Sequence, residues 1–193
     1  CNKLNVKPPV LMVGFNRRYA PFIQVLKAKI KNIKGPKAFI FTCNAGYIPH
    51  NHWIHDLEEG GGRLIGEACH FVDLLRYLVG VNIETLKVEL MRTNSEINDT
   101  FSIQITFKDG SIGTVHYLSN GNKAFPKERL EVFANRKIFQ LDNFLKIKSW
   151  GLTNNLNKRS FLQDKGQYLC VKAFLKAVEN DCPPPIPLEE VFE

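Results

Sequence analysis

Apolar and polar residues alternate with a period of two through the middle of the chain. The clearest run has Ser, Gln and Thr between its apolar residues Phe101, Ile103, Ile105 and Phe107. This alternation is typical of a strand with one buried and one polar face. Alternation, or enrichment in β-branched and aromatic residues, predicts further strands over 37–44, 86–90, 112–118, 130–133, 137–141 and 144–148. Between two of these strands, Asp109-Gly110 predicts a type I′ hairpin turn.

A period of 3.6 residues predicts three helices around these strands. The first begins at Pro21, ends at Gly35-Pro36 and has one apolar face, made of Phe22, Val25, Leu26, Ile30 and Ile33. The second follows a triple glycine at 60–62 and runs to about Leu78. The third covers 163–178, with apolar spacing at Tyr168, Val171, Leu175 and Val178, before prolines 183–185 end the regular structure.

A short buried strand is expected over Val10–Phe15, ahead of the first helix. Helices early and late, with a consecutive antiparallel run between them, predict an α+β fold. We therefore expect a mostly antiparallel β-sheet with helices packed on one face.

The helix after the triple glycine carries the residues best suited to proton transfer. At about 100° per residue, one stripe holds Glu67, His70, Asp73 and Tyr77, opposite an apolar arc. A histidine can accept a proton near neutral pH, and a neighbouring carboxylate can orient its ring. The same spacing fits a solvated helix face on which Asp73 pairs with His70, and spacing alone leaves both interpretations open.

The loops on either side of this helix hold further candidates. Asn44, Tyr47, Trp53 and His55 could line a sugar pocket or belong to an ordinary surface loop. Another loop could hold a carboxylate or phosphate through Lys123, Lys127 and Arg129, or leave these side chains solvated. A metal-dependent hydrolase is a weaker alternative, based on His50, His52, His55, Asp56, Glu58 and Glu59, and we expect no metal there.

Composition limits the class of protein and its partners. The 193 residues are 44% hydrophobic and 23% charged, which suits a globular domain with a sizeable core. No run of 18 apolar residues occurs, so we expect no membrane partner. Five cysteines without a C-x-x-C pair indicate a reducing, cytoplasmic location rather than disulfides or zinc.

The net charge of +7 is uneven, with lysines gathered around the first helix at 27, 29, 31, 34 and 37. Such a cluster is most often a solvated face. The chain has no nucleic-acid reading motif and no aromatic stacking platform, so nucleic acid is not expected as a partner. A positive field would attract a phosphorylated or carboxylated small substrate, such as a nucleotide sugar.

Three segments resemble the Gfo/Idh/MocA oxidoreductases. The family's helix motif, approximately G-G-G-x-L-x-D-x-G-x-H-x-x-D, is matched in register by Gly60, Gly61, Gly62, Leu64, His70 and Asp73. Residues 13–21 resemble the family's V-G-F-N-R-R-F-x-P segment, and 109–113 resemble a later strand turn. The sequences of residues 44–49 and 125–133 are most similar to one branch of the family. In that branch the family domain is fused behind an alcohol-dehydrogenase-like region in enzymes of surface-polysaccharide biosynthesis.

The resemblance implies the same α+β fold and an oxidoreductase that uses NAD or NADP on a sugar or nucleotide-sugar hydroxyl. His70 would transfer the proton, and Glu67 or Asp73 would orient its ring. The cofactor would be bound mainly by an N-terminal Rossmann domain, with Asn16 and Arg17 contributing from this chain. The sheet face left uncovered by helices would meet a second subunit in a homo-oligomer. A non-enzymatic sugar-binding or oligomerisation module is the main alternative.

The chain departs from the family pattern in two places. Gly66 stands where the family has its aspartate, and Glu67 supplies a carboxylate one residue further along. A glycine-rich phosphate turn and the family's Glu-Lys-Pro motif do not occur in these residues. We therefore expect residues 1–18 to be the end of a Rossmann domain and a linker, and 19–193 to be the substrate-binding and catalytic domain.

Overall fold

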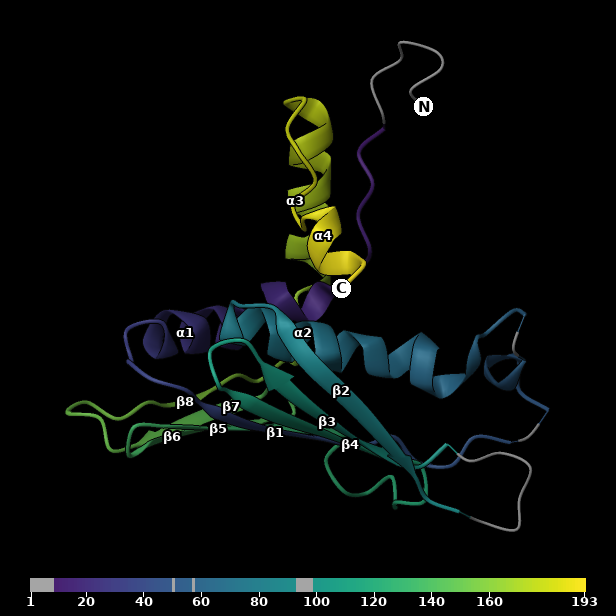
Figure 1. Cartoon of the computed structure of the whole chain (residues 1–193), viewed down its shortest axis with the longest axis horizontal. Coiled ribbons are helices and arrows are strands. Elements are labelled where there is room, and N and C mark those ends of the chain that lie inside the picture. Colours follow the sequence, from purple (N-terminus) through teal and green to yellow (C-terminus); the bar gives the residue numbers. More distant parts are fainter. Residues whose placement is uncertain (1–8, 50, 57, 93–98) are drawn as a thin grey trace.

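The computed structural model describes residues 9–49, 51–56, 58–92 and 99–193. Eight strands form a single sheet with the order β2-β3-β4-β1-β5-β6-β7-β8, and two helices cover one of its faces (Figure 1). The strands are β1 Ala38–Asn44, β2 Ile83–Leu90, β3 Phe101–Phe107, β4 Ile112–Leu118, β5 Glu128–Ala134, β6 Lys137–Asp142, β7 Lys146–Trp150 and β8 Asn157–Arg159. The α+β fold with a mostly antiparallel sheet is therefore confirmed.

The first strand lies in the middle of the sheet and not at its beginning. β1 pairs in parallel with β4, with Phe41 opposite Val115, and antiparallel with β5, with Phe41 opposite Leu130. The predicted consecutive run of antiparallel strands is therefore interrupted, because β1 lies between β4 and β5. A parallel pair needs a long crossover connection, and the chain between β1 and β4 supplies one that contains a helix and two strands.

Two of the three tight hairpins use a pair of consecutive left-handed residues. Asn135 and Arg136 have φ of 43° and 62° between β5 and β6, and Asn143 and Phe144 have 48° and 56° between β6 and β7. Consecutive positive φ values are the type I′ pattern that matches the strand twist. The turn at 109–110 does not follow it, because in the described chain Gly110 has a φ of 81° while Asp109 is not in the left-handed region.

The inner face of the sheet packs against α1, Pro21–Ile30, and α2, Cys69–Val79. Helical spacing buries Ile23, Leu26 and Ile30 of α1, and α2 contributes further core residues, Phe71, Leu74, Leu75 and Leu78. The approach of α2 is close, since a Cβ at Gly113 of β4 would lie 2.9 Å from Cδ1 of Leu75. This packing fixes the position of α2, which carries the candidate catalytic residues.

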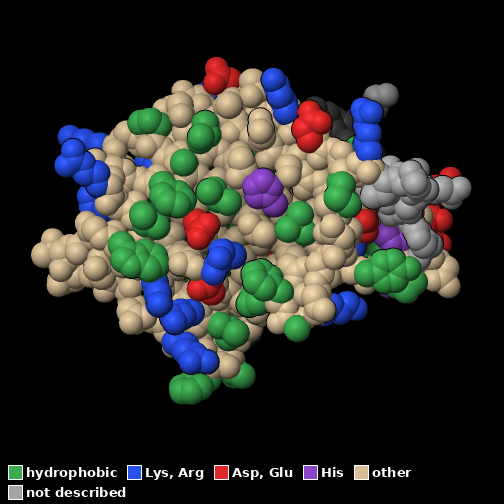
Figure 2. Space-filling view, turned by 90° about the horizontal axis from the view of Figure 1, so that it is seen from below, with side chains coloured by type: hydrophobic (Ala, Val, Ile, Leu, Met, Phe, Trp, Pro, Cys, Tyr) green, Lys and Arg blue, Asp and Glu red, His purple; other side chains and the backbone are tan. Residues whose placement is uncertain are grey.

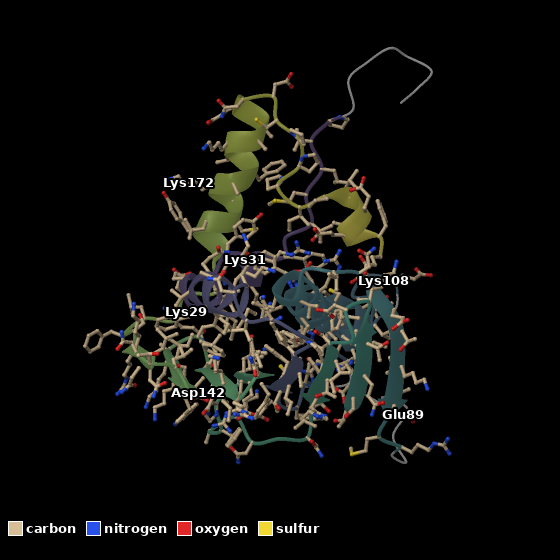
Figure 3. The ribbon with its side chains drawn as sticks, turned by 60° about the vertical axis from the view of Figure 1, so that its left-hand side comes forward. Lys29, Lys31, Glu89, Lys108, Asp142 and Lys172 are labelled. Carbon is tan, nitrogen blue, oxygen red and sulfur yellow. The ribbon has the colours of Figure 1, made fainter. Side chains whose placement is uncertain are left out.

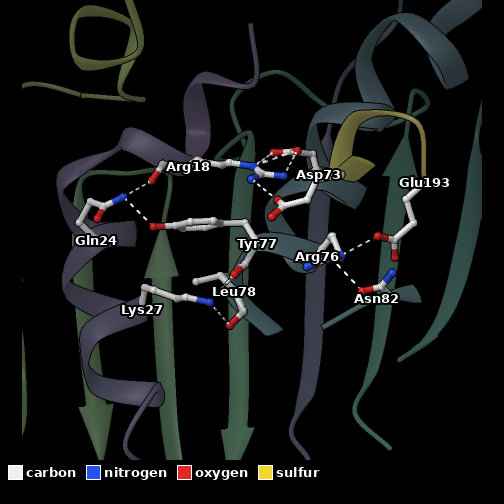
Figure 4. Close-up of polar contacts among 10 residues, drawn as sticks. Arg18, Gln24, Lys27, Asp73, Arg76, Tyr77, Leu78, Asn82 and Glu193 are labelled. Carbon is white, nitrogen blue, oxygen red and sulfur yellow. Dashed lines mark hydrogen bonds and ion pairs between the residues drawn. The ribbon is translucent and has the colours of Figure 1, made fainter. Parts of the chain in front are cut away.

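Polar side chains of α1 hold the C-terminal end of α2 (Figure 4). The ammonium of Lys27 donates to the carbonyl oxygen of Leu78 at 3.1 Å and to that of Tyr77. Nε2 of Gln24 lies 2.9 Å from the Tyr77 hydroxyl. The last carbonyls of a helix have no partner within it, so these donors satisfy them and tie the two helices together.

Above α1 and α2, on the side away from the sheet, stand α3, Gln167–Glu179, and α4, Leu188–Val191 (Figure 1). Figure 3 shows Lys172 of α3 above Lys29 and Lys31, which mark α1 and its end, and Asp142 of the sheet below them. Helix α3 begins four residues later than expected, because Gly166 at its N-cap has a φ of 85°. The prolines at 183–185 do not end the regular structure, since α4 follows them.

The apolar stripe of α3 is not part of the core. Its side chains at Tyr168, Val171, Leu175 and Val178 are all at least half exposed. The strand expected over Val10–Phe15 does not form, and residues 9–15 belong to no helix or sheet. A strand needs a neighbour for its backbone N–H and C=O groups, and the described chain pairs none with this segment. Both features lie in the upper layer (Figure 1).

None of the described helices combines the length and the apolar character needed to cross a membrane.

Candidate functional site

The triple glycine forms a tight turn against the preceding loop. The N–H groups of Gly60 and Gly61 both donate to the carbonyl of Asp56 at 2.9 Å. A Cβ at Gly60 would lie 2.6 Å from Cα of Ile54, and Gly61 and Gly62 have positive φ values of 65° and 73°. Gly60 therefore has no room for a side chain, and Gly61 and Gly62 adopt a backbone conformation that favours glycine. Together the three residues set where the next helical turn begins.

That next turn is π-helical over Leu64–Ala68 and leads directly into α2. A π turn is wider than an α turn and changes the direction of the side chains within it; such turns often occur at functional sites. A Cβ at Gly66 would lie only 3.0 Å from the carbonyl oxygen of Gly60. The position where the family has an acid is thus crowded here, and the carboxylate is carried by Glu67.

Glu67 meets one residue of the sheet and one residue of the loop before β5. Its Oε2 accepts a hydrogen bond of 2.6 Å from the hydroxyl of Tyr117 on β4. The ammonium of Lys127, which precedes β5, lies 3.9 Å from the same oxygen, and the Lys127 side chain is 45% exposed. Two predicted residues of different segments, Glu67 and Lys127, are therefore brought together at one end of the central strands.

His70 lies one turn further along α2 with its ring half-buried. The ring meets Phe15 edge to face, with 5.5 Å between centroids. Its Nδ1 is buried and has no hydrogen-bond partner in the described chain. Burial, and then the positive charge of Arg17, lower the pKa of His70, while Glu128 and Glu67 oppose this. The imidazole is therefore neutral at neutral pH, which is the form that accepts a proton.

Asp73 does not pair with His70. Its two carboxylate oxygens accept three hydrogen bonds of 2.6 to 3.0 Å from Arg18, and Arg18 also donates to Glu190 of α4 at 2.6 Å (Figure 4). Burial raises the pKa of the Asp73 carboxyl to about 6, and the hydrogen bonds from Arg18 oppose the rise. Arg18 thus joins α2 to α4. Of the two acids predicted to orient His70, Glu67 is among the charges that act on the ring and Asp73 is not.

The two residues expected to contact a cofactor are bonded within the chain. Nδ2 of Asn16 donates to the carbonyl of Lys165 at 2.8 Å. Arg17 forms an ion pair of 2.9 Å with Glu128, and its guanidinium lies 4.8 Å from the centroid of the Phe71 ring. Both residues connect the upper layer of the molecule to the layers below it.

The loop residues predicted to bind substrate divide into two groups. Asn44 is buried, and its Nδ2 donates to the carbonyls of Asn122 at 2.8 Å and Phe125 at 3.1 Å, so it shapes the loop before β5. Lys123 of that loop packs over Gly46, where a Cβ would meet its Cγ at 3.1 Å. Arg129 is not brought to the site, because alternation along β5 turns it to the outer face, where it pairs with Asp142 at 2.9 Å.

Tyr47 and Trp53 are exposed at 61% and 59%, while His55 is half-buried and its Nε2 lacks a hydrogen-bond partner in the described chain. His52 accepts from the backbone N–H of Ile54 at 3.3 Å. Of the histidines considered for a metal site, His50 lies outside the described residues. Among the described residues, no group of three or more His, Cys, Asp and Glu side chains could hold a metal ion.

Sequence reasoning missed four residues that shape the site, namely Arg63, Tyr117, Glu128 and Lys165. All four make short polar contacts over more than 35 positions of sequence separation. Tyr117 and Glu128 sit at inward positions of β4 and β5. A charged residue at an inward strand position was a usable sequence signal for Glu128, because buried charges need partners.

Comparisons with known proteins agree with the fold described above. A family model described as the GFO/IDH/MocA C-terminal domain matches residues 36–139. An uncharacterized oxidoreductase of Bacillus subtilis, YrbE, is 24% identical over 141 residues, which cover 69% of this chain and 40% of YrbE.

Two solved structures show the same fold. UDP-N-acetylglucosamine 3-dehydrogenase GnnA from Acidithiobacillus ferrooxidans is 16% identical with a TM-score of 0.70, covering 91% of this chain and 55% of GnnA. A levoglucosan dehydrogenase in complex with NADH is also 16% identical, with a TM-score of 0.72 and coverages of 95% and 60%. The chain spans less than two thirds of each of these three relatives.

Proposed function

This chain belongs to the GFO/IDH/MocA family, and from that premise we propose that it is the substrate-binding and catalytic part of an NAD(P)-dependent oxidoreductase acting on a sugar or nucleotide-sugar hydroxyl. The observation that carries the proposal is the state of His70. Its buried Nδ1 lacks a partner in the described chain, and burial lowers the pKa of its ring, which favours the neutral imidazole. A buried polar atom without a partner is costly, so this ring is a place where a hydroxyl or a further protein group can complete the hydrogen bonding.

In the proposed reaction, His70 accepts the proton of the substrate hydroxyl as the C–H bond on the carbon that carries this hydroxyl breaks. Glu67 provides the negative charge that stabilises the imidazolium so formed. Bound NAD or NADP supplies a nicotinamide ring as the hydride acceptor. The chain fits the cofactor and its substrate at His70, whose Nδ1 can still accept a hydrogen bond. Asn16 and Arg17, which were expected to contact the cofactor, are already bonded within the chain.

Lysines at the site favour a substrate with an anionic group. Lys127 is 45% exposed and too far from Glu67, at 3.9 Å, for a hydrogen bond. Its ammonium can therefore turn to a phosphate or carboxylate without leaving a buried charge unpaired. Lys123, packed over Gly46 of the neighbouring loop, is the second candidate. Dehydrogenation of a UDP-sugar by GnnA and of levoglucosan by the NADH-bound relative supports the choice of sugar substrates.

The domain that binds the nucleotide is proposed to pack on the upper layer. The half-exposed stripe of α3, made of Tyr168, Val171, Leu175 and Val178, lies in the same layer as residues 9–15 (Figure 1). An amphipathic helix whose apolar side faces water is expected to be covered by another element. Residues 1–18 then remain, in our proposal, the end of that domain and a linker, ahead of a domain formed by 19–193.

The outer face of the sheet is proposed to meet a second copy of the chain. Five neighbouring strands place one apolar residue each in a continuous row, Ile112, Ala38, Phe133, Ile138 and Trp150. Figure 2 shows this face, with hydrophobic side chains among charged ones and a histidine. A row of apolar side chains on an open sheet face is a typical contact surface.

An activity assay of the full polypeptide that carries this chain tests the proposed function. NAD or NADP is supplied with free sugars and UDP-sugars, and the formation of reduced nicotinamide is followed. His70→Ala is expected to lower kcat by about 10²- to 10⁴-fold. His116→Ala is the matched control, because His116 lies on the outer face and bonds Ser102 at 2.9 Å. Failure to reduce the nicotinamide with any sugar, or full activity of His70→Ala, contradicts the proposal.

A further inference from the structure

The carboxylate of Glu67 is anchored by a residue from inside the protein. The hydroxyl of Tyr117 donates to Oε2 of Glu67 at 2.6 Å, and Tyr117 is completely buried. Its ring stacks on Phe101 with 4.9 Å between centroids and an interplanar angle of 6°. A hydroxyl held by a packed ring has a fixed direction, so it defines where the Glu67 oxygen lies.

Arg63 fixes the direction of this hydrogen bond. Its Nε donates to the Tyr117 oxygen at 2.7 Å, and its buried guanidinium also donates to the carbonyl of Gly46 at 2.9 Å and to Asp99 at 3.0 Å. A guanidinium can only donate. The phenol oxygen therefore accepts from Arg63, and its single proton is directed to Glu67.

The two cations near Glu67 differ in how they are held. Arg63 is bound by three acceptors and its side chain is 1% exposed. Lys127 has no hydrogen bond to Glu67 at 3.9 Å and faces water. A substrate group can thus take Lys127 while Glu67 keeps its anchor, which separates substrate binding from the positioning of the carboxylate.

We propose that Tyr117, supported by Arg63, is a positioning residue that holds the Glu67 carboxylate toward His70. The catalytic meaning of this role rests on the proposed function, whereas the geometric role does not. Burial, and then the hydrogen bond to Glu67, raise the pKa of Tyr117 above its ordinary value. Tyr117 therefore stays protonated over the working pH range and acts as a constant donor.

The titration of His70 reports on the position of Glu67. The charged groups acting on its ring are Arg17 from the segment before α1, Glu128 from β5 and Glu67 from the π turn. Of these, Arg17 lowers the pKa of His70, whereas Glu128 and then Glu67 raise it. Removing the Glu67 charge, or releasing its carboxylate from this position, is therefore expected to lower the pKa of His70.

The experiment follows the His70 ring by NMR in the 193-residue chain, assigned with His70→Gln. Glu67→Gln is expected to lower the midpoint, and Tyr117→Phe is expected to reproduce a large part of that shift. Tyr77→Phe is the matched control, since it removes a hydroxyl bonded to Gln24 at the other end of α2 and should leave the midpoint unchanged. If Tyr117→Phe does not fold, Glu67→Asp replaces it, because the shorter side chain draws the carboxylate back from the phenol.

An unchanged midpoint in Tyr117→Phe, or in Glu67→Asp where that variant stands in, overturns the positioning role. An equal shift in Tyr77→Phe overturns it as well. In the full polypeptide, Tyr117→Phe is expected to lower kcat about tenfold with KM within twofold, while Lys127→Met raises KM. The NMR measurement uses no cofactor or sugar, so a shift without any turnover would reject the proposed function and leave the positioning role standing.

Discussion

The guanidinium of Arg17 donates two hydrogen bonds, of 2.9 and 3.0 Å, to the carboxylate of Glu128, whose side chain is 1% exposed. The ammonium of Lys165 donates to the same carboxylate at 2.6 Å. Glu128 therefore ties β5 to the segment before α1 and to the loop before α3. Because Arg17 and Glu128 are also among the charges that act on His70, the same contacts hold the layers together and contribute to the environment of the candidate base.

Removing the Glu128 carboxylate should be strongly destabilising. Glu128→Ala leaves two cations in a buried place without their partner, and such a break typically costs about 3–5 kcal/mol. Glu131→Ala is the control from the same strand, because alternation turns Glu131 to the outer face, and it should change stability by less than about 0.5 kcal/mol. Urea unfolding of the 193-residue chain measures both. Similar losses for the two variants would contradict the assigned role of Glu128.

The same carboxylate predicts a loss of stability in acid. Burial alone would raise the pKa of Glu128, but Arg17 and Lys165 outweigh it and hold that pKa below the usual value of 4.5. The unfolded chain then binds more protons than the folded chain in this range, so stability rises with pH there. The contribution is complete above pH 4.5 and is lost as the pH falls through the lower, folded-state pKa. Urea midpoints measured across that range should fall less steeply in Glu128→Gln.

Most of the fold could be predicted because local patterns encode it. Period-two alternation located β3 and β4, and alternation or enrichment in β-branched and aromatic residues located β5, β6 and β7. The insertion of β1 between β4 and β5 could not be predicted in this way, since its partners are about 75 and 90 residues away and no local pattern specifies them. The strand expected over 10–15 failed for the related reason that a strand depends on a neighbour.

The candidate site could be predicted only in part. Glu67 was identified because helical spacing places it on one stripe with His70, and Lys127 because it stands among the basic residues of one loop. Arg63 and Tyr117 were missed, because a buried polar residue reveals its role only through partners that are distant in sequence. Arg129 was placed among the substrate ligands by its basic neighbours, but the alternation of β5 turns it away from Glu67.

The triple-glycine turn should not tolerate a side chain at its first position. A Cβ at Gly60 would lie 2.6 Å from both Cα of Ile54 and the carbonyl oxygen of Trp53. These are backbone atoms that cannot move aside cheaply, so Gly60→Ala should lose about 2 kcal/mol or more. Gly14→Ala is the control, since nothing lies within 4 Å of its Cβ position. Equal thermal stability of the two variants would show that the turn relaxes.

The pH dependence of turnover should follow His70. Burial and Arg17 lower its pKa below 6.5, so the neutral, proton-accepting form persists into mildly acidic solution. For the full polypeptide, kcat/KM is expected to fall in acidic solution, with the midpoint of this limb below pH 6.5. Glu67→Gln should move this acidic limb to lower pH, because Glu67 raises the pKa of His70. If the fall in kcat/KM has its midpoint above pH 6.5, or persists in His70→Ala, a group other than His70 causes it.

The apolar row on the outer face of the sheet should control self-association. Phe133 lies in the middle of the row, between Ala38 on β1 and Ile138 on β6, and is 39% exposed. Phe133→Glu places a charge where two copies would meet, and burying an unpaired carboxylate in an interface is costly. It should convert the chain to monomers in sedimentation experiments, with circular dichroism unchanged. Gln104→Glu adds the same charge to the same face on β3, away from the row, and should leave association unchanged. If the unaltered chain is monomeric at every concentration tested, the row has another role.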